Sequence, residues 1–303
     1  MPIENEPLPL PISQTDAQMY AERTKSQPVP DPEIDPNNPP WGLAAGFLTW
    51  AGSVLLLLGM AIAFVIPYVV VHFPGKTKAE LEQILTTDKT VILLQILSAI
   101  PAHLLTLGIV WAVVTRFGKR RFWRTLGFTW SERVGVWTSI GLAVGLLIVG
   151  VAISQFIGGE PTSIDQIINS SNASRYTLAL LAATTAPLVE ELVYRGVLYS
   201  AVQKSAGMVW AVIVVSLLFV LVHLLQYYNN LGVIVAISIL SLSLTLVRAF
   251  SGRLLPCVVI HFIFNGLQSL YIILQPYIEH PTTNVEQKAV IFRMMSRCAR
   301  ALV

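Results

Sequence analysis

The chain has 303 residues, of which 54% are hydrophobic and only 12% are charged, with a formal net charge of +3. The hydrophobic residues form runs too long for the core of a water-soluble domain, which excludes the soluble globular class. The net charge is small and the basic residues lie between the runs, so no nucleic acid is expected among the partners.

Residues 1–40 contain many Pro, Asp and Glu residues, as in the run Pro28-Val-Pro-Asp-Pro. Such a segment is too polar and too rich in proline to pack into a core, so a disordered tail is predicted. The tail also lacks the positively charged start of a signal peptide. The first apolar run, from Trp41, is therefore expected to remain uncleaved and to insert the chain itself.

Seven apolar runs are long enough to span a bilayer, because a helix needs about 20 apolar residues to cross roughly 30 Å of hydrocarbon. All are predicted as helices, since an open strand cannot satisfy its backbone groups in lipid. They cover residues 42–72, 91–115, 135–157, 177–203, 207–226, 231–250 and 254–275. The predicted fold class is all-α, a polytopic membrane helix bundle of about seven or eight transmembrane helices.

The connection at residues 116–134 is the most basic short loop. It contains Arg116, Lys119, Arg120, Arg121, Arg124 and Arg133. The positive-inside rule predicts that this loop is cytoplasmic. Counting seven spans places residues 276–303 outside, yet they include Lys288 and Arg293, which prefer the cytoplasmic face. Either these residues form an amphipathic surface helix or tail, or one further span is present.

The fourth predicted span contains Glu190, Glu191 and Arg195 in the run Glu-Glu-Leu-Val-Tyr-Arg. Each charge costs about 3 kcal/mol at the centre of a bilayer, so a use for these groups is expected. Glu191 and Arg195 are four residues apart, in the order that favours an ion pair on one helix face. Glu190 points about 100° away and has no such partner, which predicts a different role. The alternative is that the three charged groups only hold neighbouring helices together, although a single ion pair would be enough for that.

Two later spans carry further pairs at helical spacing. Phe219 and His223 are four residues apart near the end of the fifth span, and His261 and Asn265 are four apart in the seventh. Taken alone, these are a packed histidine and an interhelical hydrogen-bonding pair. Together with the acids of the fourth span they favour a catalytic site. His103, in the second span, has no polar partner four residues away, so we interpret it as a residue used for packing or for local bonding to the backbone.

At these residues the sequence resembles the CPBP family of intramembrane proteases, which includes type II CAAX prenyl endopeptidases and bacteriocin-processing or immunity-associated proteins. The family pattern is EExxxR, then FxxxH, then HxxxN on successive helices. It is met by Glu190, Glu191 and Arg195, by Phe219 and His223, and by His261 and Asn265. The expected organisation is a disordered tail at 1–40, accessory transmembrane helices at 41–176, a CAAX-protease-like catalytic core at 177–275 and an amphipathic or tail segment at 276–303.

The resemblance implies an intramembrane endopeptidase that hydrolyses a peptide bond of a membrane-associated or lipidated peptide or protein, in CAAX-type or bacteriocin-type processing. Peptide hydrolysis needs an activated water, a proton shuttle and donors for the tetrahedral oxyanion. Glu190 with His223 is expected to activate the water, and His261 with Asn265 to donate to the oxyanion. The pair of Glu191 and Arg195 is expected to hold the helix face in place.

Two alternatives stay open at this point. Glu190, His223 and His261 could bind a divalent metal such as zinc, because two His and one Glu with an open position form a known catalytic zinc set. The metal-free glutamate mechanism is preferred, since the sequence contains no HExxH motif. A non-proteolytic immunity or scaffold protein of the same fold is the other alternative. The expected partners are the lipid bilayer and the peptide substrate, and the expected location is the plasma (inner) membrane of a prokaryote.

Overall fold

The structure of this protein is a computed structural model that describes residues 35–279 of the chain. The described residues form a succession of helices with no β-strand, which confirms the all-α prediction for this part of the chain. The predictions for residues 1–34 and 280–303 fall outside the described residues.

Seven helical stretches between residues 35 and 279 are long and apolar enough to cross a membrane, and each overlaps one of the predicted spans. They are Leu43–His72, Lys89–Thr115, Val136–Ile157, Asn172–Ala206, Met208–Tyr227, Leu231–Ser251 and Leu255–Ile278. The multi-pass membrane prediction is therefore confirmed. An eighth span would have to lie outside the described residues.

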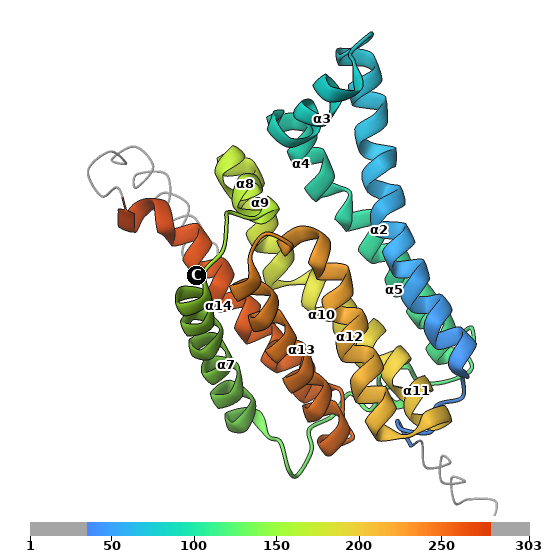
Figure 1. Cartoon of the computed structure of the whole chain (residues 1–303). Coiled ribbons are helices and arrows are strands. Elements are labelled where there is room, and N and C mark those ends of the chain that lie inside the picture. The colour runs from blue at the N-terminus through green and yellow to red at the C-terminus, as the bar shows by residue number, and fades with distance from the viewer. Residues whose placement is uncertain (1–34, 280–303) are drawn as a thin grey trace, which may run out of the picture. The chain divides into compact units, whose positions relative to one another are not determined.

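The α-helices that make up these spans are labelled in Figure 1. The first three spans are α2 (Leu43–His72), α4 (Lys89–Leu97) with α5 (Ala99–Thr115), and α7 (Val136–Ile157). The fourth consists of α9 (Asn172–Ala183), α10 (Thr185–Glu191), the π-helix η1 (Leu192–Leu198) and α11 (Tyr199–Ala206). The last three are α12 (Met208–Tyr227), α13 (Leu231–Ser251) and α14 (Leu255–Glu279). The short helices α3 (Lys78–Thr87), α6 (Phe122–Thr125) and α8 (Ser163–Ser170) lie in the connections.

Local sequence explains where several helices begin and end. Thr77 and Glu80 form a capping box at the start of α3, in which each side chain binds the other residue's backbone amide. The chain reverses from α11 into α12 at Gly207 and leaves α13 at Gly252, with φ of 85° and 65°. Glycine adopts these positive angles without the steric penalty of a Cβ, so both turns fit between consecutive spans.

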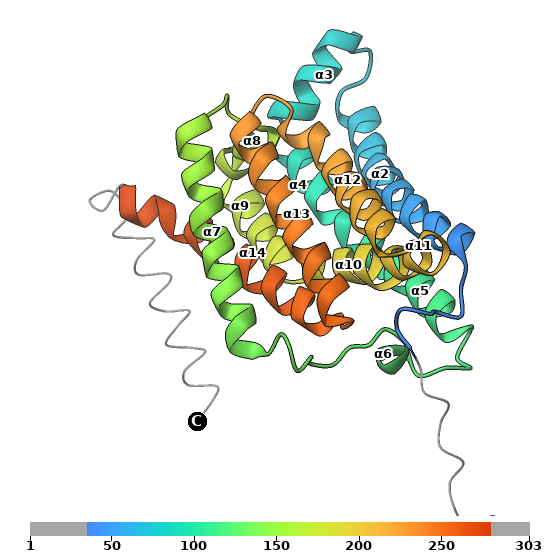
Figure 2. The same ribbon diagram turned by 60° about the horizontal axis from the view of Figure 1, so that its bottom comes forward.

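The fourth span lies inside the bundle. η1 contacts α2, α5 and α12, while α10 contacts α5 and α14. The third span, α7, packs against α13 and α14 on the other side of the bundle from α2 (Figure 2). Residues of the fourth span therefore face protein on several sides rather than lipid, which is the usual setting of ionisable groups in membrane proteins.

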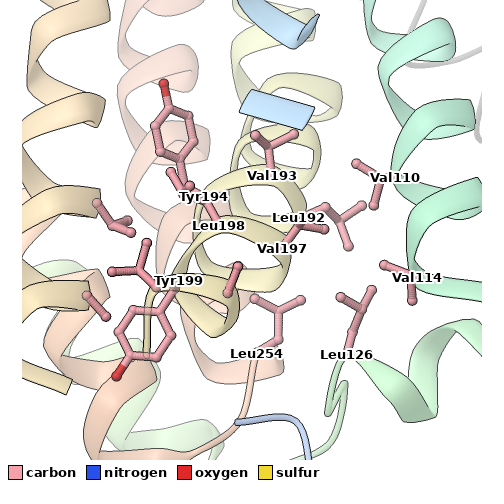
Figure 3. Close-up of a cluster of buried hydrophobic side chains, with 14 of the residues drawn as sticks. Val110, Val114, Leu126, Leu192, Val193, Tyr194, Val197, Leu198, Tyr199 and Leu254 are labelled. Atoms are coloured by element: carbon pink, nitrogen blue, oxygen red, sulfur yellow. The ribbon is translucent and has the colours of Figure 1, made fainter. Parts of the chain in front are cut away.

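The largest cluster of buried apolar side chains surrounds η1. Val197 and Leu198 are fully buried, and they pack with Val114 of α5, Leu126 and Leu254 (Figure 3). Lipid tails are as apolar as these side chains, so in the membrane their stabilising contribution comes from close packing rather than from the exclusion of water. The cluster fixes the position of η1 and of the polar groups that it carries.

Residues 35–40 close the segment predicted to be disordered, yet they lie against the bundle. The carbonyl oxygens of Pro36, Pro39 and Pro40 accept hydrogen bonds from Arg248, Lys204 and Arg116, respectively. Proline has no backbone N–H, so a proline-rich segment does not use its carbonyls in regular structure and leaves them to other donors. Disorder is therefore the wrong prediction for these six positions.

Candidate active site

Glu191 and Arg195 form the predicted ion pair at the centre of the fourth span. Both side chains are fully buried, and Nη1 of Arg195 donates to Oε1 of Glu191 at 3.0 Å. Nη2 of the same guanidinium donates to the carbonyl and the hydroxyl of Ser241 in α13, each at 3.1 Å. A buried ion pair offsets its desolvation only when further hydrogen bonds satisfy it, and α13 supplies them here.

The helix that carries this pair is not regular. α10 ends at Glu191, and Leu192–Leu198 continues as a π-helix, whose hydrogen bonds join residues five apart. We predicted a helix for residues 177–203 without distinguishing α from π geometry, and the π-helical turn at Leu192–Leu198 was not anticipated. The spacing of Glu191 and Arg195 does not distinguish the two helix types, because side chains four residues apart can pair in an α-helix or in a π-helix. π-helical turns of this kind occur frequently at functional sites.

His261 of α14 connects the two acids. Its Nδ1 lies 2.8 Å from Oε1 of Glu191, and its Nε2 lies 3.8 Å from Oε2 of Glu190. The carboxylate paired with Arg195 can only accept, so Nδ1 is the donor. The second distance is too long for a direct hydrogen bond, but a water molecule or a substrate oxygen can bridge it.

Glu190 differs from its neighbour in accessibility. Its side chain is 27% exposed, whereas those of Glu191 and His261 are 0% and 2% exposed. A fully buried carboxylate cannot reach a substrate, but a partly exposed one can. Of the two acids, Glu190 is therefore the one that a substrate can reach.

Phe219 and His223 of α12 stack on each other beside the ion pair. Their ring centroids are 4.5 Å apart at an interplanar angle of 25°, and Cζ of Arg195 lies 4.6 Å from the centroid of Phe219. Nδ1 of His223 is 2.8 Å from the carbonyl oxygen of Phe219. A carbonyl can only accept, so Nδ1 carries the hydrogen and the neutral ring has its lone pair at Nε2. His223 also borders a small apolar recess between α12 and α13.

Asn265 lies on α14 one turn after His261 but has a different partner. Its Nδ2 donates to the carbonyl of Ala182 near the end of α9 at 3.1 Å. We expected both residues of this pair to donate to an oxyanion. The structure brings only His261 into contact with the acids, while the amide of Asn265 joins α14 to the helix that precedes α10.

The alternative zinc set is not assembled. Within residues 35–279 no group of three or more His, Cys, Asp and Glu side chains is arranged to hold a metal ion. Glu190 and His261 approach each other, but His223 is stacked on Phe219 and its Nδ1 is engaged by a backbone carbonyl. The donor arrangement of the described residues therefore does not support a metalloprotease.

His103, interpreted from the sequence as a packing residue, is a polar neighbour of the site. Its Nδ1 lies 2.9 Å from Oγ1 of Thr185, the first residue of α10, and its side chain is nearly buried. The sequence criterion considered partners four residues away on the same helix, whereas Thr185 is 82 positions further along the chain. No local pattern in the sequence could have predicted the contact between His103 and Thr185.

Comparison with protein-family models gives one match, to the family described as type II CAAX prenyl endopeptidase Rce1-like, over residues 172–267. The matched segment begins with α9, ends within α14 and includes every residue of the three motifs. Neither the curated proteins nor the solved structures give a match to this chain.

Proposed function

Because residues 172–267 form a domain of the Rce1-like family of type II CAAX prenyl endopeptidases, we propose that this protein is an intramembrane endopeptidase with Glu190 as its catalytic base. One observation carries the proposal. Glu190 is partly exposed and faces an imidazole that is itself held by a fully buried ion pair. Such an arrangement keeps one carboxylate accessible for chemistry while the other fixes its surroundings.

The proposed reaction begins with a water molecule beside Glu190. The carboxylate takes one proton of the water, and the resulting hydroxide attacks the carbonyl carbon of the scissile peptide bond. His223, with its lone pair at Nε2, is proposed to take the second proton of the water when the tetrahedral intermediate collapses. When the C–N bond breaks, the proton held by Glu190 passes to the leaving amine. The products are a carboxylate and a free amine.

His261 is proposed to stabilise the oxyanion that forms between these two steps. In its protonated form the ring carries a hydrogen on Nε2, which faces Glu190. This N–H can donate to the carbonyl oxygen as negative charge develops there, in a site that lies within the spans and is poor in water. Asn265, already bound to the carbonyl of Ala182, is proposed to support this function by holding α14 against α9.

Glu191 and Arg195 are proposed to position the site rather than to react. Oε1 of Glu191 accepts from both Arg195 and His261, so one oxygen sets the orientation of the imidazole. Arg195 in turn is held by Ser241 of α13 and by the ring of Phe219. This arrangement gives each of the three family motifs a contact with the next.

The proposed substrate is a peptide segment of a membrane-associated or lipidated protein, cut in CAAX-type or bacteriocin-type processing. The family match supports a peptide substrate. The position of α10 inside the bundle supports a substrate that reaches the site from within the membrane. The loss of Glu190 or His223 would have favoured a non-proteolytic protein of the same fold, and both are present.

The direct test is cleavage of quenched peptides by the purified full-length protein in lipid nanodiscs. The panel contains a farnesylated CAAX peptide, its unlipidated twin and an unrelated hydrophobic peptide. We expect cleavage of at least one member by the native protein and none by the Glu190→Gln variant. If no member is cleaved by well-folded protein, or if Glu190→Gln cleaves equally well, the proposal is refuted.

A further inference from the structure

Two buried side chains from outside the fourth span bind carbonyl groups of η1. Nε1 of Trp41 donates to the carbonyl of Val197 at 3.0 Å, and Nε of Arg248 donates to the carbonyl of Arg195 at 3.1 Å. Trp41 is 6% exposed and Arg248 is 1% exposed, so neither donor has water as an alternative partner. A π-helix is rare and irregular in its hydrogen bonding, so donors from outside stabilise its carbonyls in this form.

Arg248 also holds the segment before the first span, residues 35–41, which we call the N-terminal strap. Its Nη1 donates to Oδ1 of Asn37 at 2.8 Å, and its Nη2 donates to the carbonyl of Pro36 at 3.2 Å. The strap fits closely here, because a Cβ added at Gly127 would lie 2.6 Å from Cγ of Pro36. One guanidinium therefore joins the strap to the π-helix.

A continuous series of contacts then leads from the strap to Glu190. Arg248 binds the backbone of Arg195, whose side chain binds Glu191. Glu191 binds His261, and His261 faces Glu190. The strap precedes the segment that matches the family model, residues 172–267, so it lies outside that match.

We propose that Asn37, Trp41 and Arg248 are positioning residues for the candidate active site, which hold η1 in its π form and so align Arg195 with both Glu191 and α13. The catalytic part of this inference rests on the proposed function. If the turn relaxed to a regular α-helix, the side chains after Glu191 would rotate relative to α13. Arg195 would then no longer bind Ser241 and Glu191 at the same time. Because Glu191 also orients His261, the imidazole would lose its fixed orientation as well.

The test uses four variants of the full chain in nanodiscs. Asn37→Leu removes the side-chain acceptor of Arg248 and leaves its two carbonyl acceptors, while Asn37→Asp keeps an oxygen at that position and serves as the conservative rescue. Trp41→Phe keeps the apolar ring and removes its donor. Lys204→Gln is the matched control, because Lys204 donates to the carbonyl of Pro39 in the strap and makes no hydrogen bond to η1 among the described residues.

The first measurement is hydrogen exchange of the backbone amides of residues 192–198, which does not depend on activity. We expect exchange to rise by about tenfold in Asn37→Leu and by about fivefold in Trp41→Phe, as for the loss of one hydrogen bond. Asn37→Asp and Lys204→Gln should exchange like the native protein. Unchanged exchange in both Asn37→Leu and Trp41→Phe would overturn the inference, as would an equal rise in Lys204→Gln.

The second measurement separates positioning from stability. We expect Asn37→Leu to lower kcat by about tenfold with KM within about twofold, because alignment for the reaction is lost and binding is not. Asn37→Asp should restore kcat. A normal kcat alongside faster exchange would overturn the positioning role. If the native protein cleaves no peptide, the proposed function fails, and the exchange result alone still decides whether the strap controls η1.

Discussion

Nδ1 of His261 lies 2.8 Å from Oε1 of Glu191, the same oxygen that Nη1 of Arg195 binds at 3.0 Å. The second acid of the pair therefore holds the histidine that faces the first acid. The two neighbouring carboxylates have separate surroundings but are joined through one imidazole. Each can be tested by a substitution that removes its charge and keeps its shape.

Glu190→Gln should abolish cleavage and leave the fold intact. The amide keeps the size of the carboxylate and can still hydrogen-bond, but it cannot take a proton from water. General base catalysis contributes about 10²-fold to 10⁴-fold, so the cleavage rate should fall by at least that lower factor. The rate is measured with a quenched peptide, next to a melting curve. A variant that loses activity only because it unfolds would contradict the assignment.

Glu191→Gln should behave differently, because it leaves Arg195 without its counter-charge in a fully buried site. Breaking a buried pair in this way costs about 3–5 kcal/mol, so the melting temperature and the yield should both fall. The double variant Glu191→Gln with Arg195→Gln removes both charges and should recover part of the stability. A Glu191→Gln protein that melts like the native protein would show that the pair contributes little.

His103→Leu should reduce kcat/KM by about tenfold, because the start of α10 loses a hydrogen bond of the kind that aligns catalytic groups. His103→Asn should retain more activity, since its amide can occupy the position of Nδ1 beside Thr185. His72→Asn, at the exposed end of α2, is the control and should cleave normally. Native activity in His103→Leu would return this residue to the packing role that its sequence context indicates.

Prolonged chelation should leave cleavage intact, because the described residues place no three-ligand group around Glu190. Metal content of the purified protein is measured by mass spectrometry before and after treatment, and activity is assayed in parallel. Loss of activity together with a stoichiometric metal, followed by recovery when zinc is added back, would instead support ligation by Glu190, His223 and His261.

The loop at residues 116–134 should be accessible from the cytoplasm. Arg116 of this loop binds the carbonyl of Pro40, so the start of the first span lies at the same end of the bundle. Single cysteines placed at Lys119 and at Lys78, in the preceding connection, should react with an impermeant reagent from opposite sides of the membrane. Labelling of both from one side would overturn the topology that the basic residues predict.

The sequence by itself determined the class of this protein, the seven spans and the chemical groups of the candidate site. Span length depends on bilayer thickness, and the insertion cost of a charge depends on its immediate neighbours, so both are properties of a short stretch of chain. The same holds for the ion pair of Glu191 and Arg195, whose partners lie on one helix turn. Residue spacing was sufficient for each of these inferences.

Only the tertiary structure decided which group each side chain contacts. His261 binds Glu191 across 70 positions of the chain, and Arg248 binds Asn37 across 211. The partner of His103 and the placement of residues 35–40 likewise depend on groups that other helices bring to them. Such contacts arise from the packing of whole helices, in which ridges and small residues set each neighbour's rotation. A pattern within one helix carries no information about the rotation of the next.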